Sequence, residues 1–298
     1  KEKGRNQFHI FDPGQYAFRK ERRNLLMEIS RALENEEFEL YFQPQLRMAD
    51  CQVIAFEALI RWNHPEKGLI TPGAFLPAVA NSHLEIPLGQ WVLKEAIHQM
   101  NRWREAGEAL AVSINISAPH LMDRKFADYL EGYLQSHPEV SPGQITLEVL
   151  ESTALEDTKR ASNVLARCQS LGLQVALDDF GTGFSSLTYL RTLPVDVIKI
   201  DQSFVRNMLT DANDRAIVES VIFLAQRFDH PVLAEGVETM DHAAALRDMG
   251  CNLVQGYGIA RPMPSGAVLE WLQHWRRQIE SRKEIQQLQA VSEQGEGI

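Results

Sequence analysis

The chain has 298 residues, of which 44% are hydrophobic and 23% are charged, and its formal net charge is −10. This length and composition are typical of a globular protein with a sizeable core. No apolar run reaches the about 18 residues that are needed to span a bilayer as a helix. Because non-specific binding to nucleic acid depends on a basic surface, the acidic balance argues against a nucleic-acid polymer as a partner.

The N-terminus and the cysteines indicate the context of the chain. It begins at Lys1 rather than Met and shows no basic-then-apolar signal segment, so we expect a fragment of a longer protein. Cys51, Cys168 and Cys251 are scattered without metal-type spacing, which favours a reducing cytoplasm over a disulfide framework. We therefore expect a cytoplasmic domain, with any membrane anchor of the full-length protein in a segment outside this sequence.

The first predicted elements are a helix and two strands. Apolar residues at helical spacing predict a helix over residues 21–35. The runs FELYFQPQL and VIAFEALIRW predict strands over residues 38–46 and 53–62, and Pro44 predicts that the first is an edge strand or stops just before the proline. Because the turn at residues 50–51 is short, the two strands must pair antiparallel.

From residue 89 onward, helices and short apolar strands alternate. Helical patterns cover residues 89–104, 123–135, 157–171, 213–228, 241–249 and 266–277. The runs between them are typical of parallel strands buried on both faces: LAVSIN, ITLEVL, QVALDD, DVIKID, PVLAEG and NLVQGY. This alternation predicts an α/β protein built as a (β/α) barrel, with an open doubly wound sheet as the alternative. An antiparallel start is unusual for either fold.

Each apolar run after the first delivers a polar or charged side chain at or near its end. In chain order these residues are Glu57, Asn115, Glu148, Asp178 with Asp179, Lys199, Glu235 and Gln255. In a barrel the carboxyl ends of the strands meet at one mouth, where active sites are built. One acidic residue at a strand end is usually a helix cap or a solvated loop residue, but a set in register at successive ends indicates one site.

The carboxylates of this set predict a metal site. Carboxylates gathered in one cleft repel one another unless cations lie among them. Hard oxygen ligands select Mg²⁺ or Mn²⁺, or Ca²⁺ in a larger cage, and the absence of Cys and His at these positions argues against zinc. The cluster therefore predicts a metal site for two ions.

Two basic residues accompany the acidic set. Lys199 lies in the apolar run VDVIKI, which predicts a buried or half-buried ammonium that orients an attacking water or neutralises phosphate charge. Arg61 follows Glu57 at an even offset, so both side chains share one face if the strand continues. The planar guanidinium suits two phosphate oxygens, and a surface ion pair is the equally weighted alternative.

The segment DDFGTGFSS begins at Asp178. Two adjacent carboxylates cannot both point into a barrel from a regular strand, so we expect a local break or one ligand on each side of a metal pair. Gly181 and Gly183 permit a tight loop, and Ser185 and Ser186 would cap the next helix. The sequence contains no GxxxxGK[ST] motif, which excludes a P-loop.

Seven ordered motifs resemble those of the EAL domain family. They are EALIRWNHPEKGLITPGAFLP, which contains Glu57, SINIS, LEVLES, DDFGTGFSSL, VIKID, AEGVET and QGYGIARPMP, within about residues 22–275. The segments FLPAVANSH and QGYGIARP depart from the family's usual acidic residues after FIPLA and from QGYLFSRP, without removing a ligand or the lysine. The resemblance implies a modified eight-stranded (β/α) barrel whose first strand runs antiparallel.

The same resemblance implies metal-dependent hydrolysis of cyclic di-GMP to linear pGpG, with Mg²⁺ or Mn²⁺, in bacterial second-messenger signalling. Carried over by position, the metal ligands are Glu57, Asn115, Glu148, Asp178, Asp179 and Glu235. Lys199 contacts the hydrolytic water, Glu235 is also a candidate to act on the proton of that water, and Glu151 steadies the DDFGTG loop. The substrate contacts are Gln43, Arg61 and Gln255.

Partners and boundaries follow from the same resemblance. We expect a homodimer through the loop and helix after Asp179. Residues 1–21 resemble the connector that follows a GGDEF domain, so we expect an upstream regulatory or GGDEF domain in the full-length protein. The phosphodiesterase barrel would cover residues 22–278, and residues 279–298 would form a polar tail that frays or links onward.

Two other classes of function remain open. One is a receptor that binds cyclic di-GMP without cleaving it, or an enzyme held inactive without its regulatory domain, although such receptors usually lack a ligand or the lysine. The other is an enolase- or aldolase-type lyase, which would also use carboxylates at strand ends but would not show the ordered motifs. Metal-supported release of pGpG discriminates among them.

Overall fold

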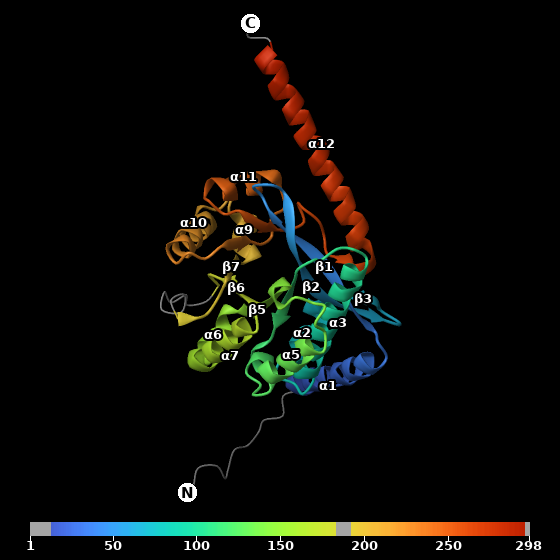
Figure 1. The fold of residues 1–298 in the computed structure, drawn as a ribbon. Coiled ribbons are helices and arrows are strands. Elements are labelled where there is room, and N and C mark those ends of the chain that lie inside the picture. Colours follow the sequence, from blue (N-terminus) through green and yellow to red (C-terminus); the bar gives the residue numbers. More distant parts are fainter. Residues whose placement is uncertain (1–12, 183–191, 296–298) are drawn as a thin grey trace. The chain divides into compact units, whose positions relative to one another are not determined.

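The computed structural model describes residues 13–182 and 192–295, without the side chains of residues 13–18, 154–156 and 282–295. Figure 1 shows the arrangement of the helices and strands. Residues 183–191 lie outside the described residues, and with them Ser185, Ser186 and part of the segment that we expect to form the dimer contact.

The strands and helices alternate along most of the chain. The strands are β1 (Phe38–Arg47), β2 (Gln52–His64), β3 (Gly68–Ile70), β4 (Val112–Ile116), β5 (Ile145–Leu150), β6 (Gln174–Phe180), β7 (Val197–Ile200), β8 (Val232–Ala234), β9 (Leu253–Gln255) and β10 (Met263–Pro264). The α-helices are α1 (Pro13–Glu34), α2 (Pro72–Val79), α3 (Glu85–Glu105), α4 (Ala118–Leu121), α5 (Phe126–Gln135), α6 (Glu151–Glu156), α7 (Thr158–Ser170), α9 (Gln202–Asn207), α10 (Ala212–Arg227), α11 (Met240–Asp248) and α12 (Val268–Gly295). Two short 3₁₀ helices, η1 (Pro142–Gln144) and η2 (Ser265–Ala267), complete the described elements.

Eight of the strands close into a barrel. The sheet order is β10-β1-β9-β8-β7-β6-β5-β4-β2-β3, and an additional β1–β2 pairing closes the ring. Strand β2 and strands β4 to β9 pair parallel in succession, whereas β1 pairs antiparallel with β9. The first strand is therefore antiparallel to its neighbours, which confirms the predicted modified barrel and excludes the open doubly wound sheet.

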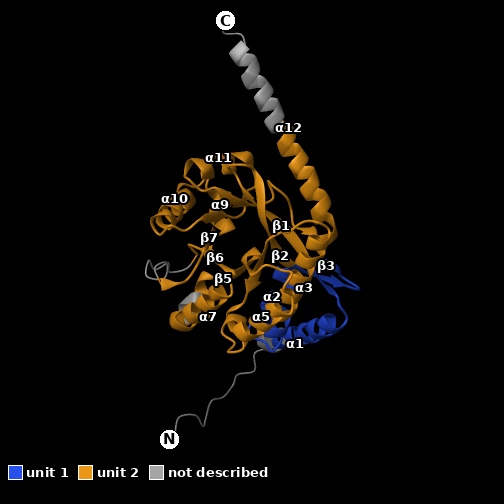
Figure 2. Ribbon diagram, viewed as in Figure 1, with its two compact units in different colours: residues 1–39, 60–88 blue, residues 40–59, 89–298 orange. Residues whose placement is uncertain are grey.

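The chain divides into two compact units, which Figure 2 shows in different colours. Unit 1 comprises residues 1–39 and 60–88, and unit 2 comprises residues 40–59 and 89–298. An aromatic cluster forms the core of unit 1: the buried ring of Trp62 meets that of Phe75 edge-on with centroids 5.8 Å apart. The indole nitrogen of Trp62 donates to Glu37 Oε2 at 3.0 Å, so the one polar atom of this ring is satisfied.

The barrel strands of unit 2 bury apolar residues between the sheet and the helices. Ile114, Leu147, Val175 and Ile198 come from four successive parallel strands and are fully buried. Helix α7 lies against β6, and α10 lies against β7. Burial of each such side chain contributes roughly 1.5–3 kcal/mol to folding. This packing holds the strands in register and so determines where the polar residues at their ends lie.

The strand β1 passes through Pro44 and is not an edge strand, so both forms of the prediction at this proline are wrong. Before the proline, Tyr41 and Phe42 pair with β10. After it, Gln45 and the next residues pair with β9. Pro44 lies where β1 changes partner, so its missing N–H falls between the two ladders.

The last helix is longer than predicted. We expected it to end near residue 277, whereas α12 continues to Gly295. The additional sequence, QIESRKEIQQLQAVSEQ, consists mainly of good helix formers and contains neither glycine nor proline before Gly295. Polarity alone therefore does not end a helix in this segment.

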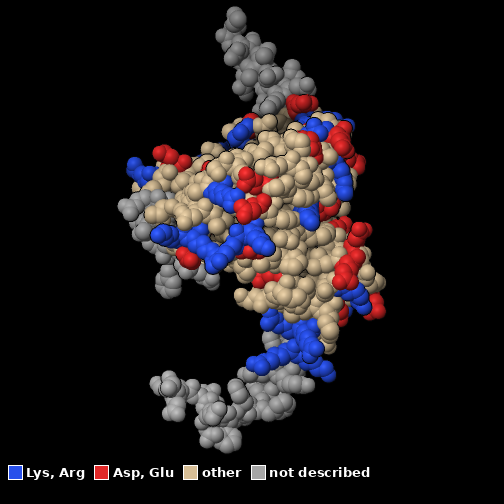
Figure 3. Space-filling view, turned by 60° about the horizontal axis from the view of Figure 1, so that its bottom comes forward, with Lys and Arg blue, Asp and Glu red and all other residues tan. Residues whose placement is uncertain are grey.

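The charges of the surface are distributed unevenly. On the face drawn in Figure 3, basic side chains gather in groups, and acidic side chains lie next to several of them. Among the described residues, Arg167 Nη2 lies 2.6 Å from Asp128 and 2.7 Å from Glu131, so its charge is paired. None of the helices in the described residues combines the length and the apolarity that are required to cross a membrane.

Candidate active site

A buried lysine lies at the centre of an acidic cluster in the barrel of unit 2. Lys199 on β7 is 1% exposed, and its Nζ lies 2.7 Å from Glu148 Oε2 and 2.7 Å from Glu235 Oε1. The third ion pair joins Nζ to Asp178 Oδ1 at 3.1 Å. Three strands and the end of β8 thus deliver four charged groups to one point, as the positions at the strand ends predict.

Strand alternation and register explain why these side chains meet. In neighbouring parallel strands, residues in register point to the same side of the sheet. Glu57 on β2 is in register with Ser113 on β4, and Asn115 is in register with Glu148 on β5. Glu148 is in turn in register with Ala176, two residues before Asp178 on β6. Each of these residues therefore faces the inside of the barrel.

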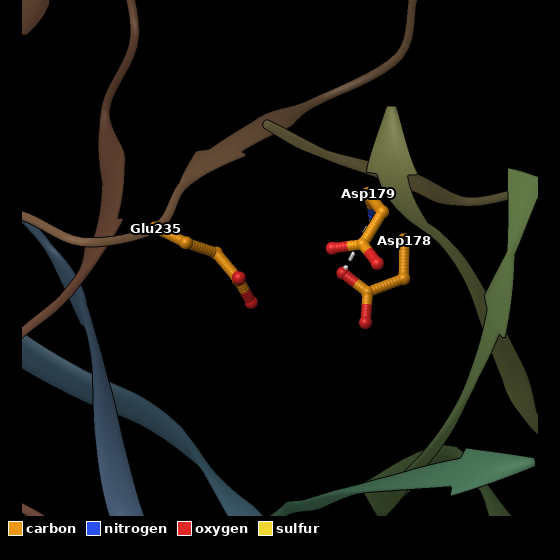
Figure 4. Close-up of side chains that lie close together, drawn as sticks. All are labelled: Asp178, Asp179 and Glu235. Carbon is orange, nitrogen blue, oxygen red and sulfur yellow. Dashed lines mark hydrogen bonds between the residues drawn. The ribbon is translucent and has the colours of Figure 1, made fainter. Parts of the chain in front are cut away.

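The two adjacent aspartates occupy a break in β6. The register against β7 shifts between Leu177 and Phe180, and Asp179 has a positive φ of 53°. The break allows Asp178 and Asp179 to turn toward Glu235, and ligand oxygens of the three carboxylates lie within 4.8 Å of one another (Figure 4). The predicted local break is therefore confirmed.

If all of its carboxyl groups were ionised, the cluster would carry more negative charge than its lysine can neutralise. Burial raises the pKa of Glu148 well above its usual value, and the neighbouring carboxylates add to the rise although Lys199 opposes it. Burial and the same neighbours raise the pKa of Glu235 to about 8. For Asp179, burial followed by Asp178 and Asp201 raises the pKa to about 6. Raised carboxyl pKa values of this kind show that another positive charge would stabilise the ionised cluster.

Lys199 keeps its proton in this environment. Burial alone would lower the pKa of its ammonium, but Glu148 and the other carboxylates more than offset this effect and raise the pKa well above its usual value. The lysine is therefore a hydrogen-bond donor and a fixed positive charge, and it does not act as a proton acceptor at neutral pH.

Amide side chains connect the acidic cluster to β1, β4 and β9. Asn115 Nδ2 donates to Glu57 Oε1 at 2.8 Å, and Gln255 Nε2 donates to Glu57 Oε2 at 2.5 Å. Gln255 Nε2 also donates to Gln43 Oε1 at 3.1 Å. The structure thus brings Glu57, Asn115, Gln255 and Gln43 into one network, in agreement with their predicted common site.

Glu151 lies beside the loop that follows the two aspartates. It is the first residue of α6, and its Oε2 accepts a hydrogen bond from the N–H of Gly181 at 3.2 Å. Gly181 has a φ of +102°, which favours glycine at this turn. Glu151 Oε1 is buried without a hydrogen-bond partner among the described residues. The structure thus places Glu151 in contact with Gly181 of the DDFGTG loop, and its predicted effect on that loop remains a prediction.

Arg61 is the one predicted site residue that belongs to unit 1. The strand β2 does continue past Glu57 to His64, as the even-offset argument requires. Within unit 1, Arg61 Nη1 donates to the carbonyl of Ile60 at 2.9 Å. Its predicted contact with substrate phosphate remains a prediction.

Sequence reasoning missed three polar residues of the site. Gln45 and Ser113 are buried and join the amide network, and Asp201 at the start of α9 raises the pKa of Asp179. Residues that are two apart on a strand face the same side of the sheet, and this rule could have found two of them. Gln45 lies two residues after Gln43, and Ser113 lies two residues before Asn115. The expected end of β1 at Pro44 obscured Gln45.

Comparison with protein families identifies this arrangement. The EAL domain matches residues 27–262 of the chain. The chain belongs to the EAL domain family. The family is typically metal-dependent, and the carboxylates of Asp178, Asp179 and Glu235 form an acidic cluster that could hold an ion in this EAL domain.

Relatives of this EAL domain are longer proteins. The chain is 37% identical over 270 residues to the bifunctional diguanylate cyclase/cyclic di-GMP phosphodiesterase MucR of Pseudomonas aeruginosa, covering 90% of this chain and 39% of that protein. It is 38% identical over 276 residues to the cyclic di-GMP phosphodiesterase PdeR of Escherichia coli, covering 92% and 41%. The EAL domain described here thus corresponds to less than half of the length of either relative.

Solved structures show the same fold. The PaMucR phosphodiesterase in complex with c-di-GMP has a TM-score of 0.79 and 38% identity, with 82% of this chain and 99% of that chain covered. The EAL enzyme Bd1971 bound to cAMP and cyclic di-GMP also has a TM-score of 0.79, at 34% identity, with 85% and 69% covered. Both structures are of proteins with cyclic di-GMP bound.

Proposed function

We propose that this chain hydrolyses one phosphodiester bond of cyclic di-GMP and releases linear pGpG, with Mg²⁺ or Mn²⁺ at the acidic cluster. The observation that carries the proposal is the convergence of Glu148, Asp178 and Glu235 on Lys199 in a barrel of the EAL family. In the reaction a water oxygen forms a bond to phosphorus and the bond to the 3′-oxygen breaks. Relatives at 37–38% identity are described as phosphodiesterases of this substrate.

The donor set fits divalent cations. Five carboxylates face one lysine in the described site, and the pKa values of Glu148, Glu235 and Asp179 are raised, first by burial. The residues that would hold two ions are Glu57, Asn115, Glu148, Asp178, Asp179 and Glu235. When bound, such ions lower the pKa of a coordinated water and neutralise charge on the phosphoryl oxygens.

The lysine and two glutamates take separate roles in this proposal. Lys199, which its raised pKa keeps protonated, donates a hydrogen bond to the attacking water in place of one of the three carboxylates that its Nζ contacts in the structure. Glu235 holds an ion or accepts the proton of the water at its carboxylate. Glu151 positions the loop of Gly181 through its Oε2. Gln43, Arg61 and Gln255 contact the substrate, and the positive charge of Arg61 stabilises the charged phosphoryl group.

The proposal also covers how the domain is regulated and how it assembles. Because the chain covers only 39% of the bifunctional relative MucR, we infer that an upstream regulatory or GGDEF domain controls this one in the full-length protein. The segment after Asp179 would form the contact of a homodimer. A receptor that binds cyclic di-GMP without cleaving it is the alternative. The presence of every proposed ligand and of Lys199 supports the enzyme over the receptor.

Removal of Glu57 tests the assignment of the site. Glu57→Ala should lower the turnover of cyclic di-GMP at least about a hundredfold, since it removes a ligand and leaves Asn115 and Gln255 without their acceptor. The measurement is the rate of pGpG release with saturating Mn²⁺, and the exposed Glu219→Ala serves as the control. Retention of a tenth or more of the wild-type rate by Glu57→Ala would contradict the assignment.

A further inference from the structure

Three glutamine side chains of the neighbouring strands β1 and β9 form a chain of hydrogen bonds inside the barrel. Gln45 Nε2 donates to Gln255 Oε1 at 3.0 Å, and Gln255 Nε2 donates to Gln43 Oε1 at 3.1 Å. Gln43 Nε2 then donates to the carbonyl of Ala260 at 3.0 Å. Each amide accepts at its oxygen from one side and donates from its nitrogen to the other. We call these three residues the amide relay.

The groups at the two ends of the relay determine its direction. At one end, the backbone carbonyl of Ala260 requires the amide nitrogen of Gln43. At the other end, Gln45 Nε2 lies 3.4 Å from Glu148 Oε1, whose second oxygen Oε2 binds Lys199. Ser113 Oγ completes this end by donating to Gln45 Oε1 at 3.4 Å. If the amide of Gln45 were reversed, its oxygen would face the oxygens of both Gln255 and Glu148.

Burial makes such a reversal costly. Gln45 is 4% exposed and Gln255 is 3% exposed, so water cannot readily replace a lost partner. An unpaired polar group in such a place costs more than an average hydrogen bond contributes. Tight packing also holds the far end of the relay, because the N–H of Ala260 donates to the carbonyl of Gly256, where an added Cβ would lie 2.2 Å from the carbonyl oxygen of Val237.

The members of the relay differ in how many of their amide N–H groups are already hydrogen-bonded. Gln255 uses both of its N–H groups, one on Gln43 and one on Glu57 Oε2 at 2.5 Å. Gln43 uses one N–H on Ala260, and its second N–H has no partner among the described residues. Gln43 is therefore the member of the relay with a donor that is available to a ligand.

We propose that Gln45 is a positioning residue: it donates the hydrogen bond to Gln255 Oε1 that completes the amide relay, and so helps to hold Gln255 and Gln43 in the orientation in which Gln43 donates to cyclic di-GMP. The inference rests on the proposed function for the identity of the ligand, but the relay itself is a property of this chain. Gln45 touches neither the substrate nor the reacting water. It acts through Gln255, and its hydrogen bond to Glu148 links the amide relay to the acidic cluster.

Replacement of Gln45 by methionine tests the proposal. Gln45→Met keeps the length of the side chain and removes its side-chain hydrogen bonds, so Oε1 of Gln255 loses its donor and the amide is held only through its own N–H groups on Gln43 and Glu57. The matched control is Gln99→Met, because Gln99 is another buried amide of unit 2, which accepts a hydrogen bond from Arg102 on α3. If Gln45→Met does not fold, Ser113→Ala, which removes only the donor to Gln45 Oε1, tests the same relay with a smaller expected effect.

Two measurements distinguish an effect of Gln45→Met on the orientation of the Gln255 amide from a general loss of folded protein. In nuclear magnetic resonance spectra, the side-chain N–H groups of Gln255 should exchange with solvent at least about tenfold faster in Gln45→Met than in the wild type and in Gln99→Met. In the phosphodiesterase assay, KM should rise about tenfold in Gln45→Met while kcat changes less than about threefold. Thermal unfolding confirms that both variants are folded at the temperature of the assay.

The outcomes distinguish the inference from the proposed function. Exchange of the Gln255 amide within about twofold of the wild type in Gln45→Met would overturn the amide relay. Faster exchange with unchanged KM would overturn the effect of the relay on the substrate. If the wild-type chain neither binds nor cleaves cyclic di-GMP, the proposed function fails, and the exchange rates still decide whether Gln45 orients Gln255.

Discussion

Lys199 connects the sequence pattern to the electrostatics of the site. The apolar run VDVIKI predicts a buried or half-buried ammonium, and the structure confirms this prediction with three carboxylates around Nζ. A buried charge of this kind is stable only while its partners remain, because each isolated ion would lose its hydration without compensation. The lysine therefore contributes to the stability of the metal-free protein, and in the proposed function it also contributes to the chemistry.

Replacement of Lys199 by methionine should reveal both contributions. Without the ammonium, the buried carboxylates repel one another, so Lys199→Met should lower the free energy of unfolding of the metal-free protein by about 3–5 kcal/mol. Added Mn²⁺ should restore more stability to the variant than to the wild type, while turnover stays at least about a hundredfold lower. Unfolding in denaturant with chelator or Mn²⁺ measures the first effect, and pGpG release measures the second. Equal stability with chelator would contradict the account, and Lys94→Met on α3 is the exposed control.

Among individual residues of the site, the sequence predicts the charged residues better than the neutral polar ones. A carboxylate or an ammonium in an apolar run has few structural explanations, so Glu148 and Lys199 stand out. Glutamine and serine occur both on surfaces and in cores, and only pairing across the barrel shows what they contact. For this reason Gln45 was missed, although it lies on the same face of β1 as Gln43.

At the scale of elements, helix α4 packs a histidine against a glycine of α3. His120 is 1% exposed, and an added Cβ at Gly89 would lie 2.4 Å from His120 Nδ1, so only glycine allows this approach. The ring meets Phe126 edge-on with centroids 4.9 Å apart. Both ring nitrogens are buried without a hydrogen-bond partner among the described residues, and burial lowers the pKa of His120 to about 4.

This shift predicts a pH dependence of stability. The pKa of His120 is about 4 in the folded chain and 6.5 in the unfolded chain, where the ring is not buried. Between these two pH values the unfolded chain therefore binds more protons than the folded chain. The stability due to neutral His120 is therefore present above pH 6.5 and is lost as the pH falls toward 4. Between about pH 7 and pH 5 this loss amounts to about 2 kcal/mol.

His120→Phe should remove this contribution. Phenylalanine keeps an aromatic ring beside Phe126 and has no unpaired nitrogen, so the variant should be at least as stable as the wild type at about pH 7. Its free energy of unfolding in urea should fall less than that of the wild type when the pH is lowered to about 5. An identical loss in the two proteins would show that His120 does not cause the dependence.

The long, periodic elements were predictable, whereas those defined by distant pairing were not. The strand β5 has the bounds that its apolar run ITLEVL predicts, and β1 differs from its prediction by one residue. The two residues of β10, Met263 and Pro264, form a strand only because they pair with Tyr41 and Phe42. A segment of two residues carries no periodicity, so its sequence contains no such signal.

At the scale of the whole molecule, the barrel and its antiparallel first strand were predictable from the family motifs together with the hairpin of β1 and β2. The division into two units was not predictable from the sequence, because its boundaries fall within β1, β2 and α3, where the composition shows no linker. The predicted boundaries at residues 21–22 and 278–279 remain a prediction. The proposed activity of the chain depends on the barrel unit, in which the acidic cluster and the amide relay both lie.

The most direct test of the account is product analysis of cyclic di-GMP incubated with this chain in the presence of Mg²⁺, Mn²⁺ or a chelator. The account predicts that linear pGpG accumulates with the metal ions and is absent with the chelator, because the acidic cluster requires added positive charge to bind and cleave a phosphodiester. Chromatography and mass spectrometry identify the product. Binding of intact cyclic di-GMP without release of pGpG under any metal condition would contradict the proposed catalysis and favour a receptor.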